Sequence, residues 1–362
     1  MGKKTKTIVT GLKRTCIGLL LGANLCTIAL LWCCVLLTFV SAEQCPRLSL
    51  LTLAFPAFLI VNAVFLVVWL LVHCRLAWLP LAGMLPIAGY ILDYCPLHLP
   101  TPSEVTTDST LTIVSYNVGK VSVEEEQADL LTFLTLADAD IICMQEVRSG
   151  FLTEQTTKDW LQEHPYHTLF NHNELIMSRF PILGDSIPIT YPTRSNHSTA
   201  CWIDYKGDSV LIINNHLESN HLQDDEKSEY TNMIKDPHRS TLKSGSRMMI
   251  RKLSQATGFR AAQCDTLCAM LDSHSRHATI LCGDLNDTPV SYTYQRIASR
   301  LSSAYRQGGT GPGFSYSQRA FPVRIDHIFF SDRWTCTYSR IDRGILASDH
   351  YPIIAHLQEK VQ

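Results

Sequence analysis

The chain has 362 residues, of which 46% are hydrophobic and 18% charged, and its formal net charge is −2. Residues 1–100 contain seven lysines and arginines but only two acidic residues, a net charge of +5, so the remainder carries −7. An acidic remainder argues against a dedicated nucleic-acid-binding protein, although a local basic patch is compatible with it. The thirteen cysteines include no C-x-x-C pair, so neither a zinc ribbon nor a thioredoxin-like motif is supported.

Three apolar runs near the N-terminus predict a membrane anchor. The first, residues 16–40, has no charged residue, and both it and the second, residues 51–72, exceed the roughly 20 residues that cross a bilayer. The third, residues 76–92, is at the short limit for a span and contains two prolines. We therefore expect about three transmembrane helices within residues 1–93, and contact with the lipid bilayer through residues 16–92.

The positive charges predict the orientation of this anchor. The basic residues within positions 3–14 should stay in the cytoplasm, so three crossings leave the rest of the chain outside. Val40-Ser41-Ala42 resembles a signal-peptidase site, but the apolar run before it is longer than that of a signal peptide, which favours an uncleaved span. We expect a multi-pass protein of the cell membrane with an extracytoplasmic soluble domain. A linker over residues 94–110, rich in proline, serine and threonine, should precede that domain, residues 111–362.

The soluble domain opens with a strand–helix–strand pattern. The run 111–117 is rich in β-forming residues and ends on Asn117. Residues 124–137 have the helical spacing of leucine and phenylalanine, and the apolar strand 139–145 is followed by Glu146. This order places Asn117 and Glu146 at strand ends on one edge of a sheet.

The rest of the domain continues to alternate strands with helices and loops. A helix is expected over residues 259–271, and residues 219–257 form a long polar excursion of the kind that is often functional or disordered. Further strands, one of them with a turn, are expected over residues 174–182, 209–215, 279–283, 324–330 and 353–357.

Polar residues that carry chemistry lie in or at the ends of these apolar strands. Asp284 and Asn286 are two residues apart, so both should point to the same spot. Carboxylates and amides suit Mg²⁺ better than zinc, and an Asp–His pair can activate a water. The combination predicts hydrolysis of a phosphate ester. The full set is Asn117, Glu146, His216, Asp284, Asn286, Asp326, Asp349 and His350.

Seven motifs, taken in order, resemble those of the endonuclease/exonuclease/phosphatase superfamily, the fold of DNase I. The resemblance covers roughly residues 110–358 and leaves out the membrane anchor. It implies an α/β fold, a four-layer sandwich of two face-packed mixed β-sheets flanked by helices, here preceded by transmembrane helices. The motifs are Ser115-Tyr116-Asn117, Gln145-Glu146, Asn173 to Pro181, Asn215 to Glu218, Gly283 to Asn286, Ile325-Asp326-His327 and Ser348-Asp349-His350.

The resemblance also implies a metal site. Glu146 would be the principal ligand of Mg²⁺, for which Mn²⁺ is a possible substitute. Asn117 would lie beside it, and Asp349 would support the site.

The remaining residues take catalytic roles by the same resemblance. His350, oriented by Asp326, would activate the attacking water or stabilise a phosphoryl oxygen. Asp284 and Asn286 would position water and the phosphoryl group, and His216 would contact a phosphate oxygen or assist the leaving group. The sequence does not decide whether His350 or Asp284 is the base.

The function expected is Mg²⁺-dependent hydrolysis of a phosphate ester, as a phosphodiesterase or phosphatase, by a membrane-anchored domain. One alternative is a metal-dependent endonuclease or exonuclease acting on DNA, which the acidic domain makes less favourable. Another is a catalytically inactive, membrane-tethered binding module. The substrate stays open among lipid head groups, inositol phosphates, nucleotides and DNA, and the sequence indicates no protein partner.

Overall fold

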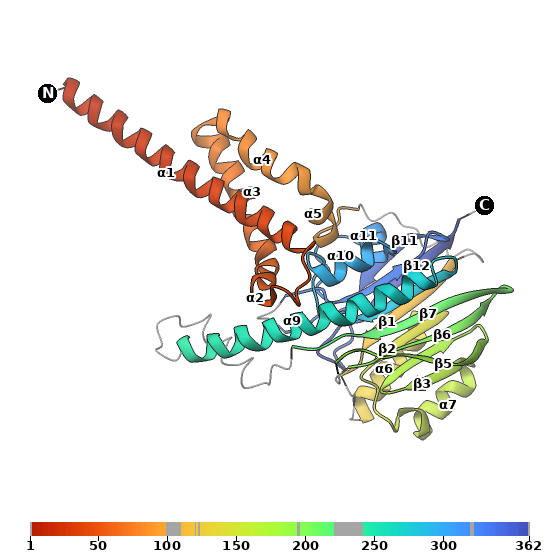
Figure 1. Ribbon diagram of the computed structural model, residues 1–362. Helices are drawn as coiled ribbons and strands as arrows, with labels where there is room; N and C mark the ends of the chain where they lie inside the picture. Colours follow the sequence, from red (N-terminus) through yellow and green to blue (C-terminus); the bar gives the residue numbers. More distant parts are fainter. Residues whose placement is uncertain are drawn as a thin grey trace.

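The computed structural model describes residues 2–98, 110–119, 121, 124–193, 196–220, 242–318 and 322–360. A group of N-terminal helices projects from one side of a β-sandwich that is covered by further helices (Figure 1). The anchor and the soluble domain are therefore distinct parts of the structure that contact each other along one surface.

Three helical segments of the anchor are long and apolar enough to cross a membrane: Gly11–Leu37, Pro46–Val72 and Cys74–Tyr94. They agree with the three expected runs, but the third is divided into short helices, as its two prolines favour. The elements are α1 (Gly2–Leu37), α2 (Pro46–Ser49), η1 (Leu50–Ala54), α3 (Phe55–Val72), η2 (Cys74–Leu76), α4 (Trp78–Met84), η3 (Leu85–Ile87) and α5 (Ala88–Tyr94).

Buried polar side chains join the first two long helices of the anchor. Asn24 Nδ2 donates to Asn62 Oδ1 at 3.1 Å, and Trp69 Nε1 donates to Asn24 Oδ1 at 2.9 Å. All three side chains are fully buried although most of the apolar surface around them is exposed. Because hydrocarbon offers no hydrogen bonds, such polar pairs hold membrane helices together.

The first sheet has the strand order β11-β12-β1-β2-β4-β3. It is mixed, because β1 and β2 run parallel while the other neighbours are antiparallel. Its strands are β1 (Thr110–Asn117), β2 (Ile141–Gln145), β3 (His167–Asn171), β4 (Glu174–Ser178), β11 (Trp334–Ile341) and β12 (Ile353–Glu359).

The second sheet has the order β5-β6-β7-β8-β10-β9, and only β7 and β8 run parallel. Each sheet therefore has one parallel pair of strands. Its strands are β5 (Ile182–Ile189), β6 (Ser198–Tyr205), β7 (Asp208–His216), β8 (Ala278–Asp284), β9 (Ser302–Ser303) and β10 (Asp326–Phe330).

Successive side chains along each strand point to opposite faces of its sheet, and this alternation builds the four expected layers. On β1, Ile113 packs between the sheets, while Val114 faces the outer layer formed by α6 and α7. On β8, Ile280 packs between the sheets, while Leu281 faces α9 and α10. The fold class predicted from the sequence is confirmed. The outer helices are α6 (Glu124–Ala137), η4 (Phe151–Thr153), α7 (Gln155–Glu163), α9 (Leu242–Ser273), α10 (Tyr292–Ala298) and α11 (Ala304–Gly308).

Two sequence expectations differ from the structure in extent. The helix expected over 259–271 is the C-terminal part of the much longer α9, so residues 242–257 of the polar excursion are helical. Residues 221–241 of that excursion lie outside the described residues, as do residues 99–109 of the linker. The described start of the linker packs on the domain, where the backbone N–H of Gly311 donates to Pro96 O at 2.8 Å.

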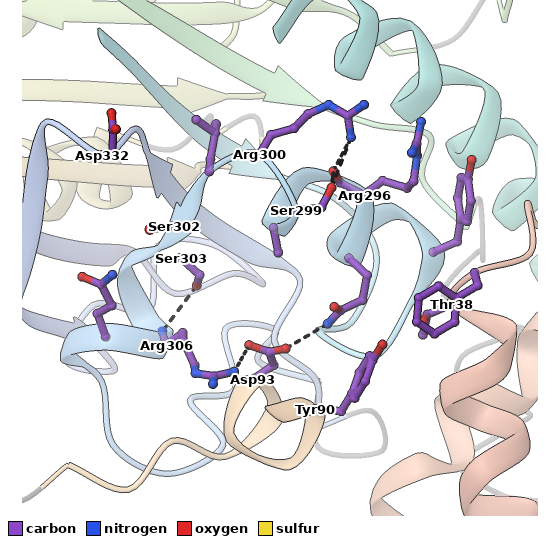
Figure 2. A pocket seen from close by; sticks show the side chains of 16 residues that line it. Thr38, Tyr90, Asp93, Arg296, Ser299, Arg300, Ser302, Ser303, Arg306 and Asp332 are labelled. Atoms are coloured by element: carbon purple, nitrogen blue, oxygen red, sulfur yellow. Dashed lines mark hydrogen bonds and ion pairs between the residues drawn. The ribbon is translucent and has the colours of Figure 1, made fainter. Parts of the chain in front are cut away.

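Asp93, near the end of α5, ties the anchor to the soluble domain (Figure 2). One of its carboxylate oxygens pairs with Arg306, and the other accepts a hydrogen bond from Gln295 Nε2 at 2.9 Å. The buried guanidinium of Arg324 donates to the backbone carbonyl of Asp93. The junction is therefore a polar contact between the last turn of α5 and the α10–α11 region.

Replacing Asp93 by alanine should loosen this junction. The charged hydrogen bond to Arg306 and the bond to Gln295 would be lost, at a cost of about 1–2 kcal/mol. Thermal unfolding of the full chain in detergent should show a melting temperature lower by several degrees. Asp332→Ala is the matched control, because Asp332 is exposed and, like Asp93, lines the pocket drawn in Figure 2. Equal melting temperatures for the two variants would contradict this role of Asp93.

Candidate active site

Strand register brings the polar strand ends to one edge of the sandwich. In the first sheet Asn117 pairs with Gln145, so Glu146 follows directly beside Asn117. In the second sheet Asp284 pairs with His216 on one side and with Asp326 on the other. The site is therefore a product of pairing between strands that are distant in sequence.

Asn117 joins the two sheets at this edge. Its Nδ2 donates to Glu146 Oε1 at 3.3 Å and to Asp284 Oδ2 at 3.2 Å. His216 Nε2 lies 3.7 Å from the same Glu146 oxygen and 3.9 Å from the same Asp284 oxygen. Side chains from β1, β2, β7 and β8 thus gather around one point.

A close approach of β8 to β7 makes this arrangement possible. A Cβ atom on Gly283 would lie 1.8 Å from Asn215 O, so only glycine fits there. The chain then turns so that Asn286, with φ of +51°, donates its backbone N–H to Asp284 Oδ1 at 2.7 Å. Asn286 Nδ2 also donates to Asp284 Oδ2 at 3.1 Å. Asp284 is therefore fixed by hydrogen bonds to both of its carboxylate oxygens.

Glu146 also has a left-handed backbone, with φ of +57°. Such a conformation is uncommon for glutamate and costs free energy, and it is found more often at functional sites than elsewhere. The side chain of Glu146 is 31% exposed, in contrast to the 1% of Asp284. Of these two carboxylates, Glu146 is the one with direct access to solvent.

His350 and Asp326 form a buried pair. His350 Nδ1 and Asp326 Oδ2 are 2.9 Å apart, and His350 Nε2 lies 3.9 Å from Asp284 Oδ2. Burial lowers the pKa of His350, but the charges of Asp326 and Asp284 outweigh burial and raise the pKa to about 10. Burial and the charge of Asp326 raise the pKa of Asp284 to about 7.

The segment that carries Asp349 docks on the end of β1. Ser348 Oγ donates to Asn117 O at 2.8 Å. Asp349 lines a cavity of about 830 Å³ together with Glu146, Asp284 and His350. Asn286 lines the same cavity.

All eight residues predicted from the sequence are thus accounted for. Five of them line this cavity directly. Of the other three, Asn117 and Asp326 are buried behind it, and His216 is 12% exposed. The structure brings the eight predicted residues together at one edge of the sandwich.

Oxygen and nitrogen ligands for a cation lie close together here. Among the described residues, one group of candidate ligand atoms lies within 4.8 Å of one another, and it comprises Asp284, Asp326 and His350. His350 and Asp326 already bond to each other, which accounts for their proximity without a metal. The carboxylates of Glu146 and Asp349, which line the same cavity, have the oxygen chemistry that Mg²⁺ prefers.

Arg260 is a site residue that the sequence did not identify. It is 3% exposed, and its Nη1 donates to Glu218 O at 3.0 Å and to Asn220 Oδ1 at 2.9 Å. Its Nε lies 3.6 Å from Asp287 Oδ2. Arg260 therefore fixes the loop after His216, and it also lines the cavity. The signal available in the sequence was that Arg260 and Gln263 are three residues apart and so share one face of α9, which also has a buried apolar face.

Glu174 is a buried acid just behind the site, at the start of β4. It is 2% exposed, and its Oε2 has no hydrogen-bond partner among the described residues. Burial raises the pKa of Glu174 from its usual value of 4.5 to about 10. The folded protein therefore holds this carboxyl group in its protonated form at neutral pH.

Solved structures are similar to this chain. The human Nocturnin catalytic domain with bound sulfate is 18% identical, with a TM-score of 0.50, over 70% of this chain and 95% of that chain. An endonuclease/exonuclease/phosphatase protein from Beutenbergia cavernae is 16% identical, with a TM-score of 0.49, over 69% and 72% of the two chains. A family protein from Bacteroides thetaiotaomicron is 18% identical, with a TM-score of 0.47, over 70% and 98%. No curated protein matched the sequence.

The sequence profile of the Endonuclease/Exonuclease/phosphatase family matches residues 114–350. The chain therefore belongs to this family, whose members are hydrolases that act on phosphoester bonds. Residues 17–94 match a second family, described as a domain of unknown function. The superfamily resemblance inferred from the motifs is confirmed, and the N-terminal helices match a different family from the rest of the chain.

Arg260→Met should destabilise the fold by about 3–5 kcal/mol, because it leaves the buried Asp287 without its cation. Urea unfolding of the full chain in detergent measures this change. Asp287→Asn added to Arg260→Met should recover part of the loss. Arg276→Met, on an exposed turn, is the matched control and should change the free energy of unfolding by less than about 0.5 kcal/mol. A loss in Arg260→Met no larger than in the control would refute the assignment.

Glu174 should make stability fall as pH rises. The folded state keeps the proton up to about pH 10, whereas the unfolded state releases it near its usual pKa, so the folded state binds more protons between these values. The free energy of unfolding should decrease through this window by at most about 1.4 kcal/mol per pH unit. Glu174→Gln removes this pH dependence. The difference between its free energy of unfolding and that of the wild type should therefore favour the variant more at about pH 8 than at about pH 5.

Glu163→Gln provides the control for this pH dependence, because Glu163 is exposed on α7. It should leave the pH dependence of the wild type unchanged. If Glu174→Gln and Glu163→Gln respond to pH in the same way, Glu174 is ionised in the folded protein and the prediction is wrong.

Proposed function

We propose that this protein is a Mg²⁺-dependent phosphoesterase, held in the membrane by its N-terminal helices and acting on the extracytoplasmic side. One observation carries the proposal. Asn117 hydrogen-bonds Glu146 of its own sheet and Asp284 of the other, and Asp284 lies 3.9 Å from His350 on the same cavity. A metal-ligating carboxylate, a second carboxylate and a histidine are thus close enough to act on one phosphate.

Glu146 and Asp349 would hold the cation, since they supply carboxylate oxygens, the ligand type that Mg²⁺ and Mn²⁺ take. Asn117 would support the site by holding Glu146 through its Nδ2, while its Oδ1 accepts the backbone N–H of Gly119. Glu146 is the solvent-accessible carboxylate, so it can bind an ion that keeps several of its waters. When bound, the cation supplies stabilisation of negative charge on the phosphoryl oxygens.

Within this proposal, His350 stabilises the phosphoryl group and Asp284 takes the proton of water. His350 lies between the carboxylates of Asp326 and Asp284, which favours the imidazolium form, a hydrogen-bond donor to a phosphoryl oxygen. Asp284 accepts hydrogen bonds on both oxygens, which orients it as a base. Asp326 is a positioning residue, since it fixes the ring of His350.

The reaction then proceeds by in-line attack at phosphorus. The water oxygen forms a bond to phosphorus as its proton passes to Asp284, and the bond between phosphorus and the leaving oxygen breaks. His216, whose Nε2 lies 3.9 Å from Asp284 Oδ2, assists the leaving oxygen, which takes up a proton from solvent water. Asn286 holds Asp284 in place through its backbone and side-chain amides.

The ends of the membrane helices support the extracytoplasmic orientation. The turn between α1 and α3 packs on α9, and the end of α5 contacts Arg306 and Arg324, so these ends share the side of the soluble domain. The basic residues within positions 3–14 belong to the first turns of α1 and Arg75 to η2 after α3, at the opposite ends of these helices, whereas Arg47 of α2 lies at the end near the domain. Positive charge marks the cytoplasmic side. We accordingly divide the chain into an anchor (1–93), a linker (94–110) and a catalytic domain (111–362).

Glu146→Ala and His350→Ala should each lower the rate at least about 100-fold, the scale of a metal-ligand or proton-transfer contribution. Hydrolysis of bis(para-nitrophenyl) phosphate and para-nitrophenyl phosphate by the full chain in detergent with Mg²⁺ measures this. A chelator should abolish the activity, and Mn²⁺ should restore it.

Glu163→Ala and His167→Ala are the matched controls, because both residues are exposed and neither lines the cavity. They should leave the rate unchanged. Activity near that of the wild type in either site variant would refute its role. A folded wild-type protein with no turnover of any phosphate ester would favour the inactive binding module.

A further inference from the structure

The membrane anchor forms part of the wall of the catalytic cavity. Leu53 of η1, between the first two long helices of the anchor, lines the same cavity as Glu146, Asp284 and His350. From this we propose, building on the phosphoesterase function above, that the substrate is a membrane phospholipid. Its phosphate would lie at the catalytic residues while its hydrocarbon chains contact the anchor.

Packing of the anchor against α9 places Leu53 at the cavity. Both α2 and η1 contact α9, which runs beneath the anchor (Figure 1). At Gly258 of α9, an added Cβ would lie 3.8 Å from Ala42 O and 3.9 Å from Pro46 Cβ, so the anchor touches the helix there. The turns of α9 on either side of Gly258 supply Leu253, Thr257 and Arg260 to the cavity wall. One helix therefore has contacts with both the anchor and the catalytic cavity.

Exposed apolar side chains lie around this cavity. Leu53 is 43% exposed and Leu346, four residues before His350, is 75% exposed; both line the cavity together with Leu253. Large exposed apolar groups that gather at one site mark a surface that binds apolar partners. Hydrocarbon chains of a lipid would cover them.

The charges of the cavity favour a single phosphate over a nucleic acid. A polyanion would meet a surplus of carboxylates, which one bound cation could offset for one phosphate but not for many. Among the described lining residues, Tyr316 is the only aromatic that could stack on a base, and its ring already packs against His350 at 5.1 Å. The charged lining groups are Glu126, Glu146, Asp284 and Asp349 against Arg260 and His350.

The anchor also sets the position of the cavity relative to a bilayer. The membrane segment Gly11–Leu37 ends, and Pro46–Val72 begins, at the turn that packs on α9. Leu53 follows Pro46 by seven residues, within the second apolar segment. The cavity wall therefore begins where these segments leave the membrane, so a lipid of that leaflet reaches the site directly.

The test uses the full chain reconstituted with Mg²⁺ into vesicles that contain phosphatidylcholine, phosphatidylethanolamine, phosphatidylglycerol, phosphatidylinositol phosphates and sphingomyelin. Mass spectrometry follows the loss of each lipid, and bis(para-nitrophenyl) phosphate is assayed in parallel. We expect chelator-sensitive loss of at least one lipid. Hydrolysis of the soluble ester without loss of any lipid overturns the lipid proposal but leaves the phosphoesterase function standing. Hydrolysis of neither overturns both.

Variants of the apolar wall separate lipid binding from chemistry. Leu53→Asp and Leu346→Asp should each lower the ratio of lipid rate to soluble-ester rate by about tenfold, because the hydrocarbon chains of a bound lipid would then cover a carboxylate in place of an apolar side chain. Leu53→Met should keep the ratio of the wild type. Leu136→Asp is the matched control, since Leu136 is 80% exposed on α6, away from the cavity. An unchanged ratio in both aspartate variants would overturn the proposal.

Discussion

The hydrogen bond from Asn117 to Asp284 is the contact on which the site depends. It crosses from the first sheet to the second at 3.2 Å, and the same amide reaches Glu146 at 3.3 Å. Because an amide has no charge to lose, it can hold two carboxylates close together at any ordinary pH. Each sheet alone presents half of the polar set, so the packing of the two sheets assembles the site.

The sequence predicted the strands of the site because buried strands are short apolar runs that stop on a polar residue. Asn117, Glu146 and Asp284 all follow such runs, and the structure places them together. The sequence missed β3, β5, β6, β9, β11, α7, α10 and α11; most residues of β3 and β5 are not buried, but β6 is largely buried and lies inside its sheet. The buried strands that end on polar site residues were therefore predictable, whereas an interior strand without such an ending and most of the edge strands and covering helices were not.

The contacts between segments that are distant in sequence could not be predicted from the sequence. Nothing in the apolar segment around Leu53 indicated that it lines the cavity, because that depends on how the anchor packs on α9. Arg260 was missed for a related reason: its buried partners, Glu218 O and Asp287, come from two other segments. The N-terminal helices thus contribute a side chain to the wall of the cavity that the predicted site residues line.

The most direct test is a crystal structure of the protein with Mn²⁺, located by its anomalous scattering. Our account predicts an ion bound to Glu146 on the cavity side, within reach of Asn117 and Asp349 and facing His350. An ion found only elsewhere, for example at the stacked pair His172 and His197, would contradict it, as would a Glu146 turned away from the cavity.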